Sequence, residues 1–181
     1  MEVIPTTLNG LLRIKPRIFR DERGYFLETF NSAAFAGTTG IRAPFVQCNE
    51  SVSHKGVLRG LHLQAHPHAQ AKLVRVACGA VLDVCVDLRK GSATFGKHIA
   101  VRLDATDREM LYIPEGMAHG FVALEDNTVF SYMCSAPYAP QAERTVLWND
   151  PELGIDWGVD DPVVNAKDRA GSPFAERCWE K

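Results

Sequence analysis

The chain has 181 residues, of which 46% are apolar and 23% are charged, a balance typical of a globular protein with a sizeable core. Its formal net charge of -2, without any run of Lys or Arg, argues against a nucleic-acid partner. No apolar run reaches membrane-spanning length, and the start of the chain lacks the regions of a signal peptide. Cys78, Cys85 and Cys134 lie inside apolar runs and form no CxxC pair, so we expect buried, reduced thiols in a cytoplasmic protein without a membrane partner.

Short segments rich in β-branched residues, separated by turn residues, predict a chain built mostly of strands. Gly79 joins two of these segments in a pattern typical of a hairpin. One short helix is expected over Ser32–Ala36, with Asn31 or Ser32 as its N-cap. The expected strands cover residues 11–19, 25–30, 72–78, 80–87, 98–103, 109–113, 119–124 and 128–134.

Many short strands with turns between them predict an antiparallel β-barrel or jelly roll with few short helices. No linker, low-complexity segment or internal repeat divides the chain, so residues 1–181 are expected to form one domain. The tail after Trp148 is rich in Asp, Gly and Pro. We expect it to wrap the surface, with its polar residues within reach of the barrel mouth. Asp83 falls in an expected buried strand, where its carboxylate needs a partner.

Two segments concentrate the reactive side chains. The first is residues 59–72, RGLHLQAHPHAQAK, in which Arg59 and His62 have opposite parity along a strand. A local bend is therefore needed to bring both side chains into one cavity. The second is residues 113–121, IPEGMAHGF, whose Pro and Gly predict a turn that presents His119 at the start of a strand.

Both segments resemble the paired motifs of cupin barrels, with glycines and an HxH pair in the first and PxGxxH in the second. The spacing offers a metal site as an alternative, with His66, His68 and His119 as ligands. The carboxylate position of that motif holds Lys72, whose ammonium cannot ligate a cation and repels it. We therefore expect no metal or other cofactor, and we expect His66 and His68 on an exposed loop around Pro67.

A more specific resemblance covers nearly the whole chain. The motifs that carry it are DERGYFLETF, QCNES, GVLRGLH, AQAKLVRV, GAVLDVCVDLRKGSATFG, IPEGMAHGF, the Tyr132 and Tyr138 pair, WNDPELGIDW and NAKDR. With these motifs, the sequence resembles the dTDP-4-dehydrorhamnose 3,5-epimerase family, a metal-free branch of the cupin-like barrels. The resemblance implies a dTDP-linked 4-keto-6-deoxy sugar as substrate, inverted at the two carbons beside its ketone.

Such a reaction needs a base, a group that stabilises the enolate, and an acid on the other face of the sugar. The resemblance implies that His62 is the base, and the ordinary histidine pKa of about 6.5 suits that role. It implies that Asp168 pairs with His62 and fixes its tautomer. Lys72 would stabilise the enolate, and the protonated phenol of Tyr132 would be the acid.

The resemblance also implies the residues that bind the substrate. Arginine side chains suit the diphosphate, and two phenylalanines would sandwich the thymine. These binding residues are Phe19, Arg23, Phe26, Glu28, Gln47, Asn49, Arg59, His119, Tyr138, Glu143 and Arg169.

The same resemblance implies a homodimer in which residues 11–30 cross to the partner and carry Phe19, Arg23 and Phe26 into its site. Three alternatives remain open at this stage. A single-centre epimerase would invert only C3 or only C5 of a related sugar nucleotide. A metal-dependent cupin enzyme would need the three histidines as ligands. A sugar-nucleotide binding barrel would not need an acid opposite a base.

Overall fold

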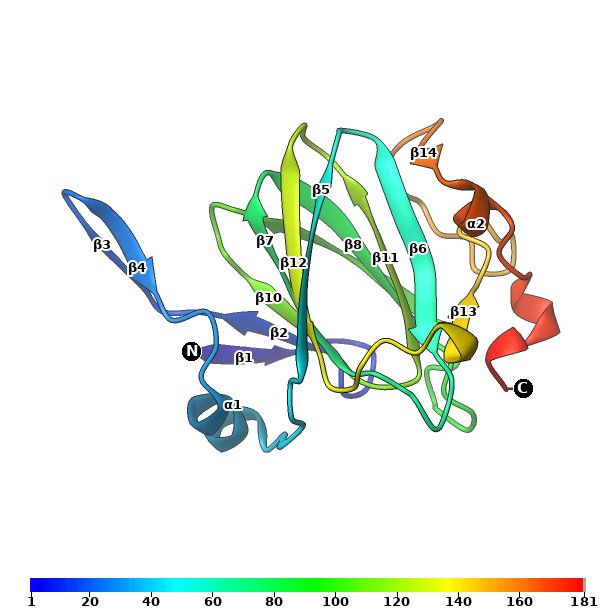
Figure 1. Ribbon diagram of the computed structural model, residues 1–181, viewed down its shortest axis with the longest axis horizontal. Coiled ribbons are helices and arrows are strands. Elements are labelled where there is room, and N and C mark those ends of the chain that lie inside the picture. The colour runs from blue at the N-terminus through cyan, green and yellow to red at the C-terminus, as the bar shows by residue number, and fades with distance from the viewer. Residues whose placement is uncertain (181) are drawn as a thin grey trace.

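Two antiparallel β-sheets face each other in the computed structural model, which describes residues 1–180 (Figure 1). Among these residues, no helix is long and apolar enough to cross a membrane. The first sheet has the order β1 (Glu2–Pro5), β2 (Leu12–Lys15), β10 (Met110–Ile113), β7 (Lys72–Cys78), β12 (Thr128–Cys134) and β5 (Gln47–Ser53). The second has the order β13 (Glu143–Thr145), β6 (Val57–Gln64), β11 (Met117–Ala123), β8 (Ala80–Asp87) and β9 (His98–Asp104), and β14 (Val163–Val164) pairs in parallel with β6. This cupin-like all-β architecture confirms the predicted fold class.

The space between the sheets is apolar at one end and polar at the other. Val74 and Phe130 from the first sheet pack with Val81 and Phe121 from the second in one buried cluster. Beyond this cluster, polar side chains of both sheets line a cavity. Alternation along each strand places both sets of side chains on the inward face, because residues two apart share one face.

The second sheet is also covered on its outer face, which holds that wall of the cavity in place. The C-terminal tail covers the second sheet, where Val84, Val86 and Trp157 belong to one buried cluster. The tail contains α2 (Ala166–Arg169) and the short 3-10 turns Phe174–Glu176 and Cys178–Glu180. Burial on both faces explains the nearly continuous apolar sequence of β8.

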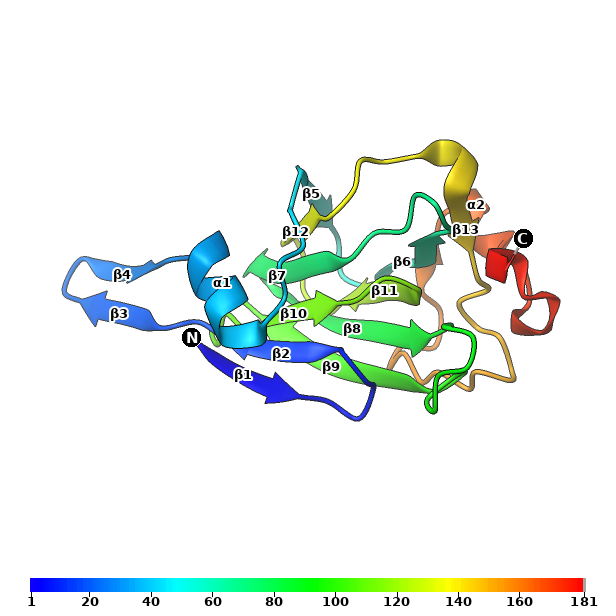
Figure 2. The ribbon, with the colours of Figure 1, turned by 90° about the horizontal axis from the view of Figure 1, so that it is seen from below.

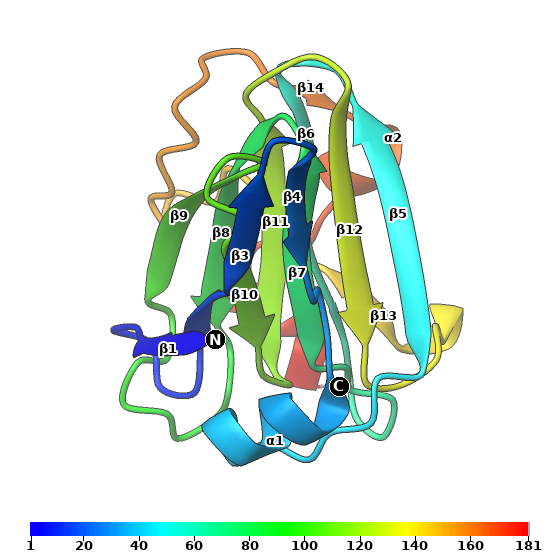
Figure 3. The ribbon, with the colours of Figure 1, turned by 90° about the vertical axis from the view of Figure 1, so that its left-hand side faces the viewer.

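Helix α1 (Ser32–Thr39) lies below the outer face of the first sheet, as Figure 3 shows. Its Phe35 is buried with Leu73 and Tyr112. The predicted helix is confirmed with Asn31 as its N-cap, because the Asn31 Oδ1 accepts from the Ala34 N–H at 3.0 Å. The helix is longer than predicted and ends where Gly40 adopts a left-handed φ of 75°.

The hairpin of β3 (Ile18–Asp21) and β4 (Gly24–Leu27) projects away from both sheets (Figures 1 and 2). A single strand over residues 11–19 was therefore wrong. The chain forms β2 and β3 instead, separated at Pro16, whose missing N–H cannot extend a ladder.

The strands predicted over residues 72–78, 80–87 and 128–134 are confirmed as β7, β8 and β12 with the same bounds. Sequence reasoning missed β5, whose residues Gln47, Asn49 and Ser51 face the cavity. Alternation predicts strands when the inward face is apolar, and here the inward face is polar. Cys85 and Cys134 are buried as predicted, but Cys78 is exposed because it ends β7 at the hairpin turn.

Candidate active site

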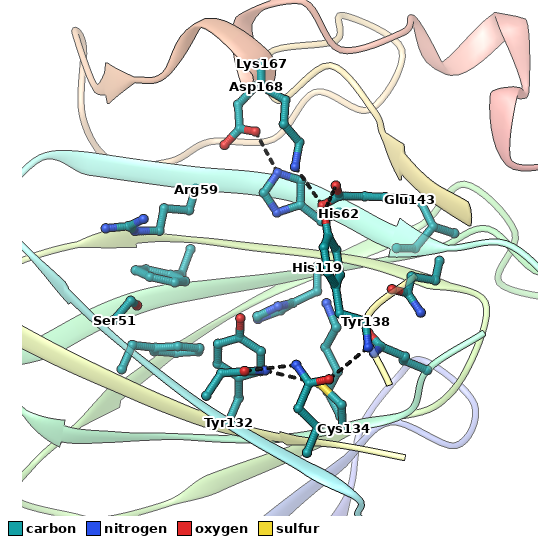
Figure 4. Close-up of a pocket in the computed structure, with 18 of the residues that line it drawn as sticks. Ser51, Arg59, His62, His119, Tyr132, Cys134, Tyr138, Glu143, Lys167 and Asp168 are labelled. Carbon is teal, nitrogen blue, oxygen red and sulfur yellow. Dashed lines mark hydrogen bonds and ion pairs between the residues drawn. The ribbon is translucent and has the colours of Figure 1, made fainter. Parts of the chain in front are cut away.

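A cavity of about 460 Å³ lies between the two sheets and receives side chains from both (Figure 4). The first sheet contributes from β5, β7 and β12, and the second from β6, β11 and β13. The tail adds Asn165, Lys167 and Asp168. This confirms the expectation that polar residues of the tail reach the barrel.

A bulge in β6 supplies the bend that Arg59 and His62 require. His62 pairs with His119 of β11, whereas Arg59 pairs with Phe121, so β6 has one more residue than β11 in this interval. Gly60 adopts a φ of +140°, and a Cβ at this position would lie 2.5 Å from the Gly120 Cα. The two glycines therefore let the strands approach closely enough for Arg59 and His62 to line the same cavity.

His62 is paired with Asp168, as predicted. Its Nε2 lies 2.6 Å from the Asp168 Oδ1, and the other carboxylate oxygen accepts from the Gly60 N–H at 3.0 Å. The side chain of Asp168 is fully buried, and that of His62 is 26% exposed. Burial acts to raise the pKa of Asp168, but the hydrogen bond and charge of His62, the Gly60 N–H and the Lys167 charge together outweigh it, so the pKa is lowered. An ionised Asp168 holds the proton of the ring on Nε2 and leaves Nδ1 as the basic nitrogen.

A short tail segment positions Asp168 against the barrel. Asn165 caps α2, and its Oδ1 accepts from the Asp168 N–H at 2.7 Å. β14, which immediately precedes this segment, pairs with β6 and so ties the tail to the strand that carries His62.

Lys72 begins β7 on the wall opposite β6, and its side chain lines the cavity. Burial lowers the pKa of the ammonium, and the nearby Cys134, Cys85, Asp83 and Glu143 oppose that change. A partly desolvated cation in this position can stabilise negative charge that develops on a bound oxygen.

Tyr132 lies on β12, across the cavity from His62, as Figure 4 shows. Burial raises the pKa of its phenol above the ordinary value, so the hydroxyl stays protonated near neutral pH. A histidine with a basic ring nitrogen and a protonated phenol thus face each other from opposite sheets. A planar centre held between them could lose a proton on one face and gain one on the other.

The mouth of the cavity is formed by three side chains joined through Glu143. The Tyr138 hydroxyl donates to Glu143 at 2.9 Å, and the Lys167 ammonium pairs with the same carboxylate at 2.7 Å. Burial acts to raise the pKa of Glu143, but these two hydrogen bonds outweigh it and lower the pKa. Lys167 was missed in the sequence, although it directly precedes the predicted Asp168.

The remaining predicted residues of the barrel also line the cavity. The Arg59 Nε donates to the Ser53 hydroxyl at 3.1 Å, which fixes the guanidinium near the edge strand β5. The Gln47 amide donates to Asn49 at 2.9 Å and accepts from the Tyr138 N–H at 2.8 Å. Sequence reasoning missed Ser51, Gln64 and Gln70 as lining residues, because a polar residue in a strand or loop does not by itself indicate that its side chain faces inward.

Five predicted binding residues lie elsewhere in the described chain. Arg169 lies outside the cavity, where its Nε donates to the Val164 carbonyl at 3.0 Å. Phe19, Arg23 and Phe26 lie on the projecting hairpin, and Glu28 follows it and accepts from Asn31 at 3.2 Å. A single chain does not bring these residues to its own cavity.

The three histidines of the metal-site alternative do not converge. His119 lies on β11 inside the cavity, whereas His66 and His68 lie on an exposed turn, as the favoured interpretation predicted. Over the described residues, no three His, Cys, Asp or Glu side chains form a group that could hold a metal ion. The metal-site interpretation therefore loses the ligand set on which it depended.

A cupin-like barrel with a His–Asp pair, a buried lysine and an opposed tyrosine defines an enzyme that moves protons on a bound substrate. The family model described as dTDP-4-dehydrorhamnose 3,5-epimerase matches residues 5–176. The chain therefore belongs to the dTDP-4-dehydrorhamnose 3,5-epimerase family, whose members are isomerases.

Individual relatives agree with this assignment. The dTDP-4-dehydrorhamnose 3,5-epimerase of Shigella flexneri is 47% identical over 97% of both chains. The dTDP-6-deoxy-D-glucose-3,5-epimerase of Legionella pneumophila, solved with dTDP-4-keto-L-rhamnose, is 41% identical with a TM-score of 0.92, covering 97% of this chain and 96% of that one. A 3′-monoepimerase of Streptomyces bikiniensis, solved with dTDP-quinovose, is 38% identical with a TM-score of 0.90 and covers 94% and 87% of the two chains.

Proposed function

We propose that this chain inverts C3 and C5 of dTDP-4-dehydro-6-deoxyglucose and so produces dTDP-4-dehydrorhamnose. The observation that carries the proposal is the His62–Asp168 pair at 2.6 Å, which faces a protonated Tyr132 across the cavity. The family membership supports the substrate class, and the Legionella relative was solved with a sugar nucleotide of this kind.

In the proposed mechanism, the C4 ketone acidifies the hydrogens on C3 and C5. The basic Nδ1 of His62 removes one of these protons, and the electron pair of the C–H bond moves to the ketone oxygen. Lys72 stabilises the resulting enolate, which gives the largest single contribution in reactions of this type. Tyr132 then donates a proton to the opposite face of the same carbon, which inverts that centre. The imidazolium that forms on His62 is stabilised by the buried Asp168.

One alternative to inversion at both carbons is inversion at a single carbon. A 3′-monoepimerase shares this fold at 38% identity, so a single-centre reaction is compatible with the same architecture. The number of carbons that exchange hydrogen with solvent distinguishes inversion at one carbon from inversion at two.

Proton NMR of dTDP-4-dehydro-6-deoxyglucose in deuterated water, with enzyme and a chelator, tests the proposal. Deuterium at both C3 and C5 supports the double epimerase, and deuterium at one carbon supports the single-centre reaction. No exchange at either carbon contradicts both.

Two pairs of variants then test the assigned residues. His62→Asn should abolish exchange, whereas His54→Asn, at a side chain that is 81% exposed, should leave it unchanged. Tyr132→Phe should block inversion, whereas Tyr112→Phe, which packs beneath α1, should not. Equal effects within either pair would contradict the assigned role.

We also propose a homodimer in which the β3–β4 hairpin completes the partner's cavity. Phe19 and Phe26 are 49% and 69% exposed on the hairpin, which is a large apolar area for a lone chain to leave in water. The hairpin also holds Arg23, a cation suited to a diphosphate.

Within the same proposal, residues 1–181 form one domain, and the enzyme acts in the cytoplasm with its cysteines reduced.

Mixing two inactive variants tests the shared site. A chain with His62→Asn keeps an intact hairpin, and a chain with Phe19→Ala, Arg23→Ala and Phe26→Ala together keeps an intact His62. Half of the randomly mixed dimers contain both chains and so have one complete site, which restores roughly a quarter of the wild-type activity. No recovery after denaturation and co-refolding would contradict the exchanged hairpin.

A further inference from the structure

A second His–Asp pair lies directly beside the first. His119 of β11 is the cross-strand partner of His62, and its Nε2 lies 2.9 Å from the Asp83 Oδ2. The Asp83 side chain is fully buried, and that of His119 is 8% exposed where it lines the cavity. Asp168 approaches His62 from the tail, whereas Asp83 approaches His119 from β8.

A fully buried carboxylate is costly unless charges or hydrogen bonds compensate it. Within residues 1–180, Asp83 forms an ion pair with His119 alone, and its other oxygen contacts the Cys85 thiol at 3.9 Å. Its charge also acts on Lys72, the cavity cation that the mechanism assigns to the enolate. Each cation that compensates Asp83 therefore lines the cavity.

Asp87, four residues further along β8, shows what a structural carboxylate looks like in this protein. It is also fully buried, but it is bound by the Arg89 guanidinium at 2.7 Å and by the Ser92 and Thr94 hydroxyls at 2.6 Å each. These partners build the loop after β8, and none of them lines the cavity. Asp83 does not stabilise a loop in this way, so a structural role of this kind does not explain why a carboxylate is buried at this position.

We propose that Asp83 is a positioning residue for the reaction, which orients the His119 ring toward the substrate and balances the positive charge at the inner end of the cavity. The inference rests on the proposed function, because it assigns work on the substrate to this second pair. With Nε2–H donated to Asp83, the Nδ1 of His119 is left for the cavity. When an anionic oxygen of the substrate binds there, Nδ1 can hold a proton and donate it in a hydrogen bond, since Asp83 offsets the charge.

Loss of the Asp83 charge should lower the pKa of Lys72, which gives the reaction a pH effect of known direction. The groups that face Lys72 are Cys85 and Asp83 on β8, Cys134 on β12 and Glu143 on β13. Burial lowers the Lys72 pKa, and the Asp83 charge opposes this. Removing that charge lets the pKa fall further, so the lysine loses its proton at a lower pH.

The test is Asp83→Asn, which keeps the shape and an acceptor oxygen but removes the charge. We expect kcat/KM to fall about 10- to 100-fold and the alkaline limb of the kcat profile to move down by about one pH unit. Asp87→Asn is the matched control, since it removes a buried charge from the same strand. It should lower Tm without moving the alkaline limb.

A double-mutant cycle with His119→Gln tests whether Asp83 acts through His119. We expect the double variant to lose less activity than the product of the two single losses, because the partners form one unit. A moved alkaline limb together with such non-additivity supports the proposal. An unmoved limb, or losses that multiply independently, would overturn it.

A measurement on the unaltered protein covers the case in which Asp83→Asn does not fold. Ring ¹⁵N NMR should show the His119 proton on Nε2, and adding dTDP should change the Nδ1 resonance. A ring protonated on Nδ1 alone would overturn the proposal. Failure of the proposed function is separate, because it would appear as absent deuterium exchange in the wild-type enzyme.

Discussion

Replacing Asp168 with asparagine changes a single atom of the His62 pair and tests the base directly. The Asp168 Oδ2 accepts from the Gly60 N–H at 3.0 Å, and the amide oxygen of asparagine can keep that bond. The amide N–H₂ then faces the His62 Nε2, which lies 2.6 Å from the Oδ1 it replaces. Since an amide nitrogen donates, the ring must accept at Nε2 and hold its proton on Nδ1. The basic lone pair is thereby lost from the cavity.

The expected size of the effect follows from two losses. The charge-assisted hydrogen bond contributes about 2–3 kcal/mol, and the carboxylate's stabilisation of the imidazolium adds about 2 kcal/mol. The sum of about 4–5 kcal/mol corresponds to a roughly 10³- to 10⁴-fold fall in kcat. The assay is the rate of deuterium entry at C3 and C5. The control is Asp150→Asn, a buried carboxylate of the same tail that accepts from the Glu152 and Phe174 N–H groups and lies outside the cavity.

The same variant has a pH-dependent effect on stability. The pKa of Asp168 is lowered from 3.8 in the folded state, so its charge stabilises the fold above that pH, and this stability is lost as the pH falls through the folded pKa. Asp168→Asn should therefore lower Tm at pH 7, and the difference from wild type should shrink in acid. A kcat within tenfold of wild type, with a normal Tm, would refute the assignment of His62 as a base oriented by Asp168.

Three further changes test other parts of the site. Lys72→Met should reduce deuterium exchange about 10²- to 10³-fold with little change in KM, since the ammonium acts on the enolate; equal losses in binding would contradict this role. Gly60→Ala should lower Tm strongly or prevent folding, because a Cβ there would lie 2.5 Å from the Gly120 Cα at a φ of +140°; a normal Tm would show that β6 can relax. Phe26→Ala should raise KM about tenfold while leaving Tm nearly unchanged, since its ring is 69% exposed in the single chain; an unchanged KM would remove Phe26 from the site.

Sequence patterns predicted those strands whose inward faces are apolar. β7, β8 and β12 carry Val and Phe toward the barrel interior, and their runs of apolar, often β-branched residues predict strands. β5 has the same geometry but turns Gln47, Asn49 and Ser51 inward, where they form the wall of a polar cavity. The cavity requires polar residues on the inward face of β5, which reverses the usual apolar-inward alternation. Hydrophobic periodicity alone therefore could not predict this strand.

The residues of the site were predicted from motifs, but their assembly was not. The opposite parity of Arg59 and His62 indicated that a bend was needed, and the bulge with its Gly60–Gly120 contact supplies it. The contact between the tail and β6 that delivers Asp168 joins residues 106 positions apart. No local pattern encodes such a contact, because it depends on which strands become neighbours.

The two histidines of the cavity differ in what their carboxylates can do. Asp168 belongs to a tail segment and lies beside a ring that is 26% exposed, so the His62 side remains open to the mouth where substrate enters. Asp83 lies in the middle of β8 and is sealed between the sheets, so its charge cannot be screened by water. The more exposed His62–Asp168 pair suits proton transfer to and from the substrate. The buried His119–Asp83 pair suits a fixed electrostatic field. Adjacent positions on two strands can thus hold a base and an electrostatic support, because one carboxylate comes from the C-terminal tail and the other from the neighbouring strand β8.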